Sequence, residues 1–398
     1  MLRKILSIKI HFDFSSIRND RKLILKQVQQ KMKPTKEQLF KRQITLSEIG
    51  EVGQQKLQNA SVLVIGCGGL GSPIAVHLAA SGIGKLHLVD FDTIAVSNLH
   101  RQVYYSLDDV GKSKAETLAK FIEKRAPFTE VNFSNNPITK TNVFELISEV
   151  DIVVDGTDSL PTKYLLNDAC VIKNKPLVYG SLYKFDGYVS SFNIKQEDGS
   201  FSANLRDAFP KMATDVPNCE EAGTMNAIVG IIAMQQVNEV LKIIAGIGKP
   251  LANELLVFNS LNTSQFKMKL TSLDSCHSER RQRISTIFEN ETYFDASCEI
   301  QNPDWLISSD ELKNIILDTE RSRSVEIISV LKNLETPFTV DKEIPINQLD
   351  VEEFQIQEDK KYVLVCQKGI TSYKATSLLK ERFPEATIVS LAGGVSNY

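Results

Sequence analysis

The sequence predicts an α/β protein in which a doubly wound, mostly parallel sheet is followed by a smaller α/β domain. A length of 398 residues exceeds what one ordinary hydrophobic core holds, so two domains are expected. Short β-branched segments alternate with helical ones, which is the pattern of parallel sheets covered by helices. The polar stretch over residues 271–303 interrupts this pattern and is interpreted as a linker. The expected division is an N-terminal extension (1–31), a first domain (32–270), the linker and a second domain (304–398).

The bulk composition is that of a soluble globular protein, with 42% hydrophobic and 24% charged residues. A net charge of −3 lacks the basic surplus of nucleic-acid binders. The longest apolar run, residues 227–234, is too short to cross a bilayer. Six cysteines stand at long spacings with no CxxC pair, which argues against a disulfide scaffold. We therefore expect a cytoplasmic protein that binds neither nucleic acid nor membrane.

The elements of the first domain follow from local patterns. A polar helix is expected over residues 35–57, before a β-branched run at 61–66 that ends in glycines, as buried parallel strands do. A helix over 72–81 comes next, with Pro73 tolerated in its first turn. The alternation continues with strands at 85–92, 130–135, 151–158 and 176–181, a helix at 112–125, and further strands around a long helix at 224–245. That helix carries apolar residues at helical spacing, which predicts a core or dimer-interface position.

A glycine-rich segment, Gly66–Gly71, lies between the first strand and the next helix and matches GxGxxG. Glycines let backbone N–H groups approach a phosphate, and the helix N-terminus adds positive potential. The segment therefore predicts a nucleotide site formed by Gly66, Gly68, Gly69 and Gly71. It does not choose the nucleotide, because an NAD-dependent oxidoreductase would use the same loop with Asp90 on a ribose.

Three charged residues follow this loop and can flank the same strand-end crevice. Arg101 and Lys114 come after the second strand, where both can face the phosphates of a nucleotide. Attack of a carboxylate on an α-phosphate needs such cations, whereas hydride transfer does not. Asp158 ends the segment DIVVDGTD and is placed to hold Mg²⁺. Each residue has a simpler interpretation, as a surface cation or a helix N-cap, but all three flank one crevice.

The motifs GCGGLGSP, VDFDTIAVSNLHRQ, GKSKAE and DGTD occur in this order within residues 35–270. Together they resemble the HesA/MoeB/ThiF family of adenylyltransferases, relatives of ubiquitin-activating enzymes. The resemblance implies a Rossmann-like sheet of the ubiquitin-activating-enzyme type. It also implies that ATP adenylates the C-terminal glycine carboxylate of a ubiquitin-like sulfur-carrier protein of the MoaD or ThiS type. Thiocarboxylate formation for molybdenum-cofactor or thiamine biosynthesis would follow.

The same resemblance implies roles for individual residues. Gly69 and its neighbours would bind ATP, Asp90 the ribose hydroxyls, and Asp158 the Mg²⁺ ion. Arg42 lies in the family's RQ motif and would reach into the site of a partner subunit, which implies a homodimer. The remaining residues implied at the nucleotide are Asp92, Ser97, Asn98, Arg101, Lys114 and Ser159. Ser159 stands where the family often has Asn.

Family members often carry a structural zinc held by two CxxC pairs. The corresponding segments here are Phe201–Asn204 and Cys276–Glu279, in which three of the four ligand positions are not cysteine. A tetrahedral site with one thiolate is not a zinc site, so we predict no zinc.

Two cysteines are candidates for covalent chemistry. Cys219, in PNCEEAG, precedes a helix N-terminus, an environment that activates a thiol. It resembles a family cysteine that can form a covalent link with the carrier protein, although a half-buried loop cysteine is the simpler interpretation. Cys366 lies in KYVLVCQKGITSYKATSLL, which reads as strand, tight loop and helix.

The Cys366 segment resembles a rhodanese active loop, and ISSDELKNII and VSLAGGVSNY match the start and end of that domain. Backbone N–H groups would cradle a thiolate or persulfide there. A sulfur donor such as a cysteine desulfurase is then the expected partner. Thr371 stands where rhodaneses usually place an arginine, and VEIISVL replaces the usual Asp-Val-Arg. Sulfur transfer and a fold kept for packing or docking therefore both stay open.

Overall fold

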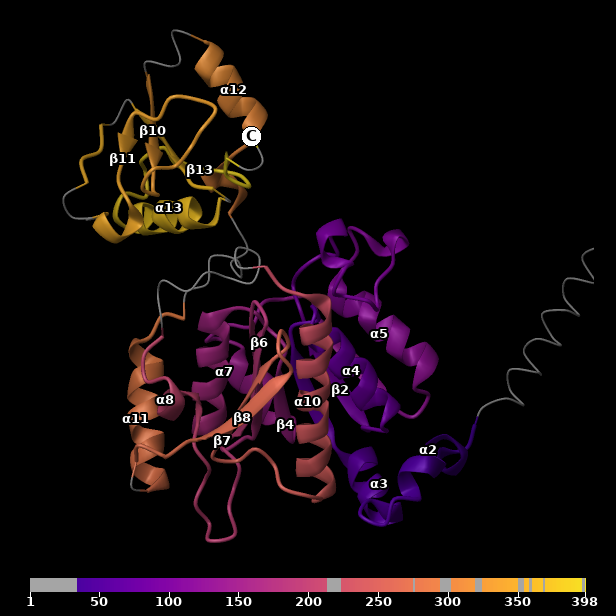
Figure 1. Ribbon diagram of the computed structural model, residues 1–398. Helices are drawn as coiled ribbons and strands as arrows, with labels where there is room; N and C mark the ends of the chain where they lie inside the picture. The colour runs from indigo at the N-terminus through magenta and orange to yellow at the C-terminus, as the bar shows by residue number, and fades with distance from the viewer. Residues whose placement is uncertain are drawn as a thin grey trace, which may run out of the picture. The chain divides into compact units, whose positions relative to one another are not determined.

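The structure is a computed structural model in two compact units, Met1–Glu291 and Thr292–Tyr398. Each unit has its own β-sheet (Figure 1). The N-terminal extension and Cys219 lie outside the described residues. The described residues are 34–212, 223–274, 276–293, 302–318, 324–349, 354–357, 360–367, 369–395 and 398.

In the described part of the first unit, eight strands form one sheet in the order β3-β2-β1-β4-β5-β6-β7-β8. Strands β1 to β5 run parallel, and β6 to β8 are antiparallel. The strand order reverses between β1 and β4, which makes this the topological switch point, where ligands bind in such sheets. The strands are β1 (Ser61–Ile65), β2 (Lys85–Val89), β3 (Glu130–Ser134), β4 (Ile152–Asp155), β5 (Leu177–Tyr183), β6 (Asp186–Phe192), β7 (Glu254–Asn259) and β8 (Ser264–Lys269).

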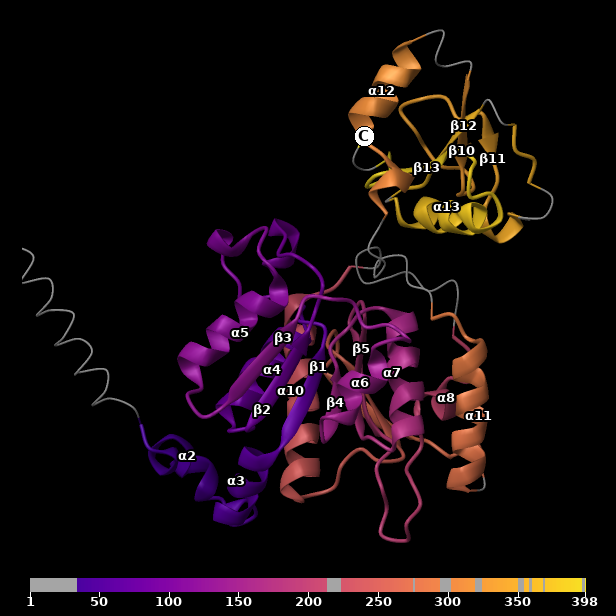
Figure 2. The same ribbon diagram turned by 180° about the vertical axis from the view of Figure 1, so that it is seen from behind.

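Helices cover both faces of this sheet, as a doubly wound fold requires (Figures 1 and 2). One face carries α4 (Gly71–Ala80), α5 (Lys114–Arg125) and α10 (Asn226–Ala245), and the other carries α6 (Val143–Ser148) and α7 (Leu160–Lys173). Shorter elements are α8 (Leu205–Ala208) and the 3₁₀ turns η1 (Val96–Asn98) and η2 (Leu107–Asp109). The predicted doubly wound, mostly parallel sheet is thus confirmed.

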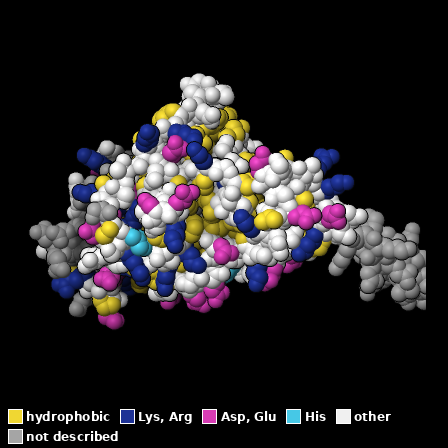
Figure 3. All heavy atoms as spheres, turned by 90° about the horizontal axis from the view of Figure 1, so that it is seen from below, with side chains coloured by type: hydrophobic (Ala, Val, Ile, Leu, Met, Phe, Trp, Pro, Cys, Tyr) yellow, Lys and Arg dark blue, Asp and Glu magenta, His cyan; other side chains and the backbone are white. Residues whose placement is uncertain are grey.

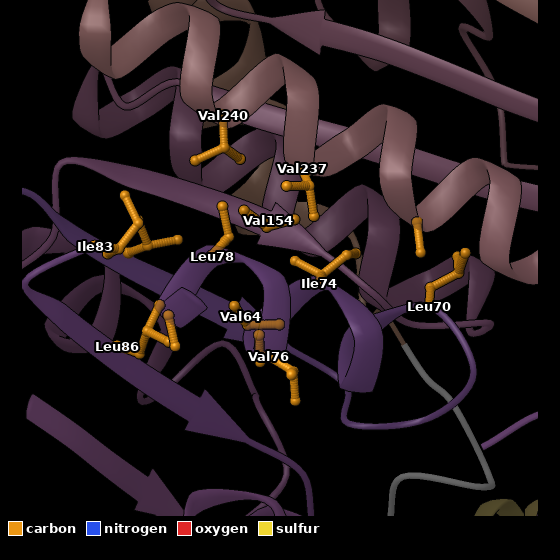
Figure 4. Packing of buried hydrophobic residues seen from close by; sticks show 14 of the residues in the cluster. Val64, Leu70, Ile74, Val76, Leu78, Ile83, Leu86, Val154, Val237 and Val240 are labelled. Atoms are coloured by element: carbon orange, nitrogen blue, oxygen red, sulfur yellow. The ribbon is translucent and has the colours of Figure 1, made fainter. Parts of the chain in front are cut away.

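The core of the first unit lies between the sheet and the α4–α10 layer. Val237 and Val240 of α10 lie over Leu78 of α4 and Val154 of β4 (Figure 4). Each fully buried side chain of this size stabilises the fold by roughly 1.5–3 kcal/mol. Among the described residues, α10 is the one helix long and apolar enough to span a membrane, but it packs against β5, β6 and α4. It is therefore the central core helix of this unit.

On the face seen from below the view of Figure 1, Lys and Arg side chains are interspersed with Asp and Glu, and hydrophobic side chains show between them (Figure 3). This mixed surface agrees with the net charge of −3.

Two predicted segments differ from the structure. The helix expected over 35–57 is two helices, α2 (Lys36–Ile44) and α3 (Gly50–Asn59), because Gly50 takes the left-handed conformation with φ of +55°. The linker expected over 271–303 is wrong for α11 (His277–Asn290), which packs against α7. Although the sequence of α11 is mostly polar, residues at four-residue spacing on one side of the helix are buried, namely Arg280, Ile284 and Phe288.

The described part of the second unit contains a five-stranded, all-parallel sheet in the order β11-β10-β12-β13-β9. Buried residues of neighbouring strands form two separate clusters, as expected for a parallel sheet covered on both faces. The strands are β9 (Leu306–Ile307), β10 (Val325–Ser329), β11 (Lys342–Glu343), β12 (Lys361–Val365) and β13 (Ile388–Leu391). The remaining elements are η3 (Pro303–Trp305), α12 (Ser309–Leu317), η5 (Ile346–Gln348) and α13 (Ile370–Arg382).

Candidate active site

The glycine loop after β1 touches the loop after β4 through backbone atoms alone. A Cβ on Gly66 would lie 2.8 Å from the carbonyl oxygen of Gly156, and one on Gly71 would lie 1.7 Å from that of Gly66. A Cβ on Gly69 would meet Val229 of α10 at 2.8 Å. Only Gly68 has space, since its nearest neighbour would stand at 3.4 Å. Three of the four predicted loop glycines are therefore required by close packing at the switch point.

Asp90 follows β2 and fixes the start of this loop. Its Oδ2 accepts the N–H of Cys67 at 2.6 Å, and its Oδ1 accepts the N–H of Asp92 at 2.8 Å. Burial raises the pKa of Asp90 to about 6, and the nearby Lys114 ammonium offsets part of this rise. Each carboxylate oxygen keeps a second lone pair, so the group can still accept hydroxyl hydrogen bonds.

Lys114 is a buried cation, only 6% exposed, at the first residue of α5. Its Nζ lies 2.7 Å from Oδ2 of Asp92. Burial alone would lower the pKa of Lys114, but the charges of Asp90, Asp92 and Asp158 and the Asp92 hydrogen bond outweigh it, so the pKa is raised. Lys114 is therefore charged at neutral pH and stands among the three carboxylates predicted for this site.

Arg101 is half-buried and held by its own turn. Its Nη1 donates to the carbonyl oxygen of Ser97 at 3.1 Å and contacts Nε2 of His100 at the same distance. A Cβ on Gly69 would lie 3.6 Å from Cγ of Arg101, so this arginine flanks the glycine loop. Asn98 is buried, and its Oδ1 accepts the N–H of Ala95 at 3.1 Å, which shapes the turn.

Asp158 lies exposed in the turn after β4. Ser159 is the N-cap of α7, since its Oγ accepts the N–H of Thr162 at 3.1 Å. The simpler interpretation of Asp158 as the helix cap is therefore wrong. Mg²⁺ usually takes one or two carboxylates together with phosphates and waters, and an exposed carboxylate at this strand end fits that need. In the described part of the chain no three His, Cys, Asp or Glu side chains group as a metal site.

Two features of the site were not predicted from the sequence. The hydroxyl of Tyr105 donates to the carbonyl oxygens of Cys67 at 2.7 Å and of Lys114 at 3.2 Å, so it joins the glycine loop to α5. Burial raises the pKa of Tyr105, which keeps the donor protonated. A buried ion pair of Lys163 with Asp155 lies at the end of β4. Contacts between side chains and groups of different elements leave no periodic signal in a sequence.

Residues in the two segments corresponding to CxxC pairs do not fit a zinc ion. The Phe201 ring stacks on His277 with centroids 4.4 Å apart. Asn204 caps α8, accepting the N–H of Arg206 at 2.9 Å. Cys276 is an exposed free thiol, with its Sγ 3.1 Å from Oγ of Ser278. One thiolate with an aromatic ring and an amide is no tetrahedral zinc set.

An ionic cluster joins the same segments instead. The buried carboxylate of Asp207 accepts from Arg280 at 3.3 Å and from Arg283 at 3.4 Å, which ties α8 to α11. Arg206 pairs with buried Asp168 of α7 at 2.6 Å. The α7–α8–α11 layer is thus held by charge pairs between buried groups.

In the second unit, Cys366 directly follows β12. Its Sγ accepts the N–H groups of Gly369 at 3.1 Å and of Ser372 at 3.3 Å, and Oγ of Ser372 lies 3.3 Å away. Gly369 has φ of +81° and opens α13. The predicted strand, tight loop and helix around a cradled thiol are therefore present. The thiol itself is buried, 1% exposed.

The first unit is thus an α/β nucleotide-binding unit whose glycine loop stands beside a buried lysine and a flanking arginine. The chain belongs to the ThiF family, whose model matches residues 40–278. The predicted adenylyltransferase is thereby confirmed, and the NAD-dependent oxidoreductase is set aside.

Relatives extend over both units. The sulfur carrier protein adenylyltransferase of Thermus thermophilus is 40% identical over 249 residues, 62% of this chain and 92% of its own. The adenylyltransferase and sulfurtransferase MOCS3 of Drosophila sechellia is 34% identical over 376 residues, 89% of this chain and 81% of its own. A match over 89% of the chain extends into the second unit, whose all-parallel sheet is consistent with the predicted rhodanese-like domain. The crystal structure of E. coli MccB with AMPCPP and MccA has a TM-score of 0.51 at 26% identity, over 56% of this chain and 68% of that one.

Proposed function

We propose that this chain uses Mg·ATP to adenylate the C-terminal glycine carboxylate of a ubiquitin-like sulfur-carrier protein. A carboxylate oxygen attacks the α-phosphorus, the bond from that phosphorus to the bridging oxygen of the β-phosphate breaks, and pyrophosphate leaves. The product is an acyl-adenylate, and no protein nucleophile is needed. The observation that carries the proposal is the buried, charged Lys114 beside the glycine loop. The names of two relatives, a sulfur carrier protein adenylyltransferase and an adenylyltransferase and sulfurtransferase, support the choice of substrate.

Each residue then has a chemical task. The backbone of Gly68 and Gly69 approaches the phosphates, and Asp90 accepts the ribose hydroxyls. Arg101 and Lys114 neutralise the charge that grows on the phosphoryl group and the departing pyrophosphate, an effect that works best in a water-poor site. Asn98, Ser97, Asp92 and Ser159 complete the nucleotide surroundings. When bound, Mg²⁺ would supply further neutralisation of the phosphates through Asp158.

Two further parts of the proposal concern partners. The protein acts as a homodimer in which Arg42, exposed on α2, reaches into the nucleotide site of the partner subunit. Cys366 accepts the outer sulfur of a donor persulfide, such as that of a cysteine desulfurase, and the new persulfide attacks the acyl-adenylate carbonyl and displaces AMP. A second thiol then cleaves the S–S bond, which releases the thiocarboxylate and leaves a disulfide, while Cys219 forms the covalent link with the carrier. The carrier belongs to molybdenum-cofactor or thiamine biosynthesis. The described cysteines are all free thiols, which supports a reducing cytoplasmic location.

ATP–pyrophosphate exchange tests the adenylation step. Exchange is expected only with a MoaD- or ThiS-type carrier ending in Gly-Gly, and deletion of the last glycine should abolish it. Arg101→Ala should lower the exchange rate by about 10²–10³-fold, the size expected for losing one group that stabilises developing charge. The matched control is Arg125→Ala at the far end of α5, which should leave exchange unchanged. Exchange that needs no carrier, or an unaffected Arg101→Ala, would contradict the proposal.

A second candidate for the rhodanese-like unit is docking without sulfur transfer. Thr371, where rhodaneses usually have an arginine, favours it because that position then offers no cation to a charged sulfur donor. The two candidates differ in whether the Cys366 thiol is required.

A further inference from the structure

A buried ion pair connects the residue just before the turn that carries Asp158 to the helix that follows this turn. Nζ of Lys163, in the first turns of α7, lies 2.8 Å from Oδ2 of Asp155, the last residue of β4. The two side chains are 3% and 0% exposed. Lys163 also donates to the carbonyl oxygen of Gly180 at 2.7 Å. The ammonium group therefore has two fixed acceptors.

The second oxygen of Asp155 holds the turn itself. Its Oδ1 accepts both the N–H of Thr157 at 3.0 Å and the Oγ–H of Thr157 at 2.8 Å. Asp158 is the next residue, and Ser159 already caps α7. Asp158 is exposed, and the position of its backbone, from which the carboxylate extends, is set by this short turn.

The backbone on either side of Asp155 is fixed as well. Nε2 of Gln236, on α10, donates to the carbonyl oxygen of Asp155 at 2.7 Å. The N–H of Gly156 donates to the carbonyl oxygen of Ile65 at 2.8 Å. The turn is thus tied to β1 and α10, and the Asp155 carboxylate is the side chain that connects it to α7.

A buried ion pair is a poor source of stability, because desolvation offsets most of the attraction and an apolar pair often serves as well. In some proteins such pairs are retained because they specify a geometry. Here the specified geometry is a turn at the topological switch point, next to the glycine loop, and the residue it presents is the proposed metal ligand.

We propose that Lys163 is a positioning residue for adenylation. Acting through Asp155, it holds the Gly156–Asp158 turn so that the Asp158 carboxylate faces the metal of Mg·ATP. This inference rests on the proposed role of Asp158, and Lys163 itself touches neither nucleotide nor metal.

The test is calorimetric titration of the full-length protein with ATP, with and without Mg²⁺. In Lys163→Met, which keeps most of the length of the side chain but not its charge, the gain in ATP affinity from Mg²⁺ should fall by about tenfold, within the usual range of coupling between neighbours. ATP affinity without metal should stay within about twofold of wild type, and Lys163→Arg should recover most of the gain.

A double-mutant cycle separates positioning from damage to the fold. Lys163→Met combined with Asp158→Asn should lose no more of the Mg²⁺ effect than Asp158→Asn alone, because the lysine acts only through that carboxylate. Full additivity would overturn the inference. An Mg²⁺ effect that survives in Asp158→Asn would instead contradict the proposed metal role of Asp158, and the inference with it.

The matched control breaks a different buried pair on the same helix. Asp168→Asn replaces the carboxylate that pairs with Arg206 and should lower the melting temperature while leaving the Mg²⁺ effect intact. If Lys163→Met does not fold, Thr157→Val, which removes one hydrogen bond of the turn, should give a smaller loss of the same kind.

Amide exchange gives a readout without nucleotide or metal. The N–H groups of Gly156 and Thr157 should exchange faster in Lys163→Met than in wild type, while amides of α4 keep their rates. Unchanged exchange at these two residues in a folded Lys163→Met protein would overturn the inference.

Discussion

Asp90 is the residue at which burial and function oppose each other most directly. Burial favours its protonated form, whereas two backbone N–H groups and the Lys114 ammonium favour the carboxylate. A ribose hydroxyl donates a better hydrogen bond to the charged form. The site therefore holds an acceptor whose charge changes close to neutral pH.

This conflict predicts a pH dependence of nucleotide binding. Because the pKa of Asp90 is raised to about 6, ATP affinity should fall as the pH drops from 7.5 to 5.5, approaching tenfold per unit below pH 6. The free energy of unfolding changes with pH in the opposite direction. A raised carboxyl pKa contributes stability at low pH that is lost as the pH rises through about 6. Calorimetric titrations across this range check the binding.

The matched variant for that experiment is Asp90→Asn, which retains the titration of the nucleotide's own phosphates. Subtracting its profile isolates the contribution of Asp90. Identical profiles for wild type and Asp90→Asn would show that the group does not titrate against bound ATP.

At the scale of single elements, the strand-end rule predicted which side chains lie beside the glycine loop. Asp90 and Lys114 were predicted near the glycine loop because parallel strands end at one edge, and the structure brings them together. Tyr105 and Lys163 were missed because their partners lie on other elements. Helix α11 was missed because Arg280 occupies a buried position that a hydrophobic pattern leaves out.

The α11 layer yields a prediction about metals. Since three of the four positions that would hold zinc are not cysteine, purified protein should contain no stoichiometric zinc, and chelators should not change its melting temperature. Asp207→Asn should destabilise the first unit by up to about 3–5 kcal/mol, because it leaves buried Arg280 without its carboxylate. Thermal unfolding and metal analysis are the measurements.

The control for Asp207→Asn is Asp198→Asn, which changes an exposed carboxylate near the same segment and should shift stability by less than about 0.5 kcal/mol. One zinc per chain, or a melting temperature that falls with chelator, would show that a metal site exists despite the missing cysteines.

For the whole molecule, two units with separate sheets would divide the proposed chemistry between them. The glycine loop, the cations and Asp158 all belong to the first unit, and the cradled thiol belongs to the second. Adenylation and sulfur transfer should therefore be separable by mutation.

Cys366→Ser tests this division. Carrier-dependent ATP–pyrophosphate exchange should keep its wild-type rate, because the variant leaves the first unit unchanged. Thiocarboxylate formation on the carrier, followed by mass spectrometry with a persulfide donor, should be lost. Undiminished thiocarboxylate formation would favour the docking role of the second unit. Cys276→Ser, which changes an exposed thiol, is the control and should leave both steps intact.

The last prediction follows from the proposed dimer, because each adenylation site would need residues from two chains. Arg42→Ala and Arg101→Ala should each be nearly inactive alone. When the two are mixed, a symmetric dimer exchanging its subunits would place one intact site in each hybrid, from the Arg101 of one chain and the Arg42 of the other. With random 1:1 pairing, half of the dimers are hybrids, so exchange activity should recover to about a quarter of wild type. Mixing Arg42→Ala with Lys114→Ala should behave in the same way. Mixing Arg101→Ala with Lys114→Ala should recover nothing, because every site of such a hybrid lacks either Arg101 or Lys114. Recovery in that last mixture, or none in the first two when hybrid dimers are shown to form, would place Arg42 outside the partner's site.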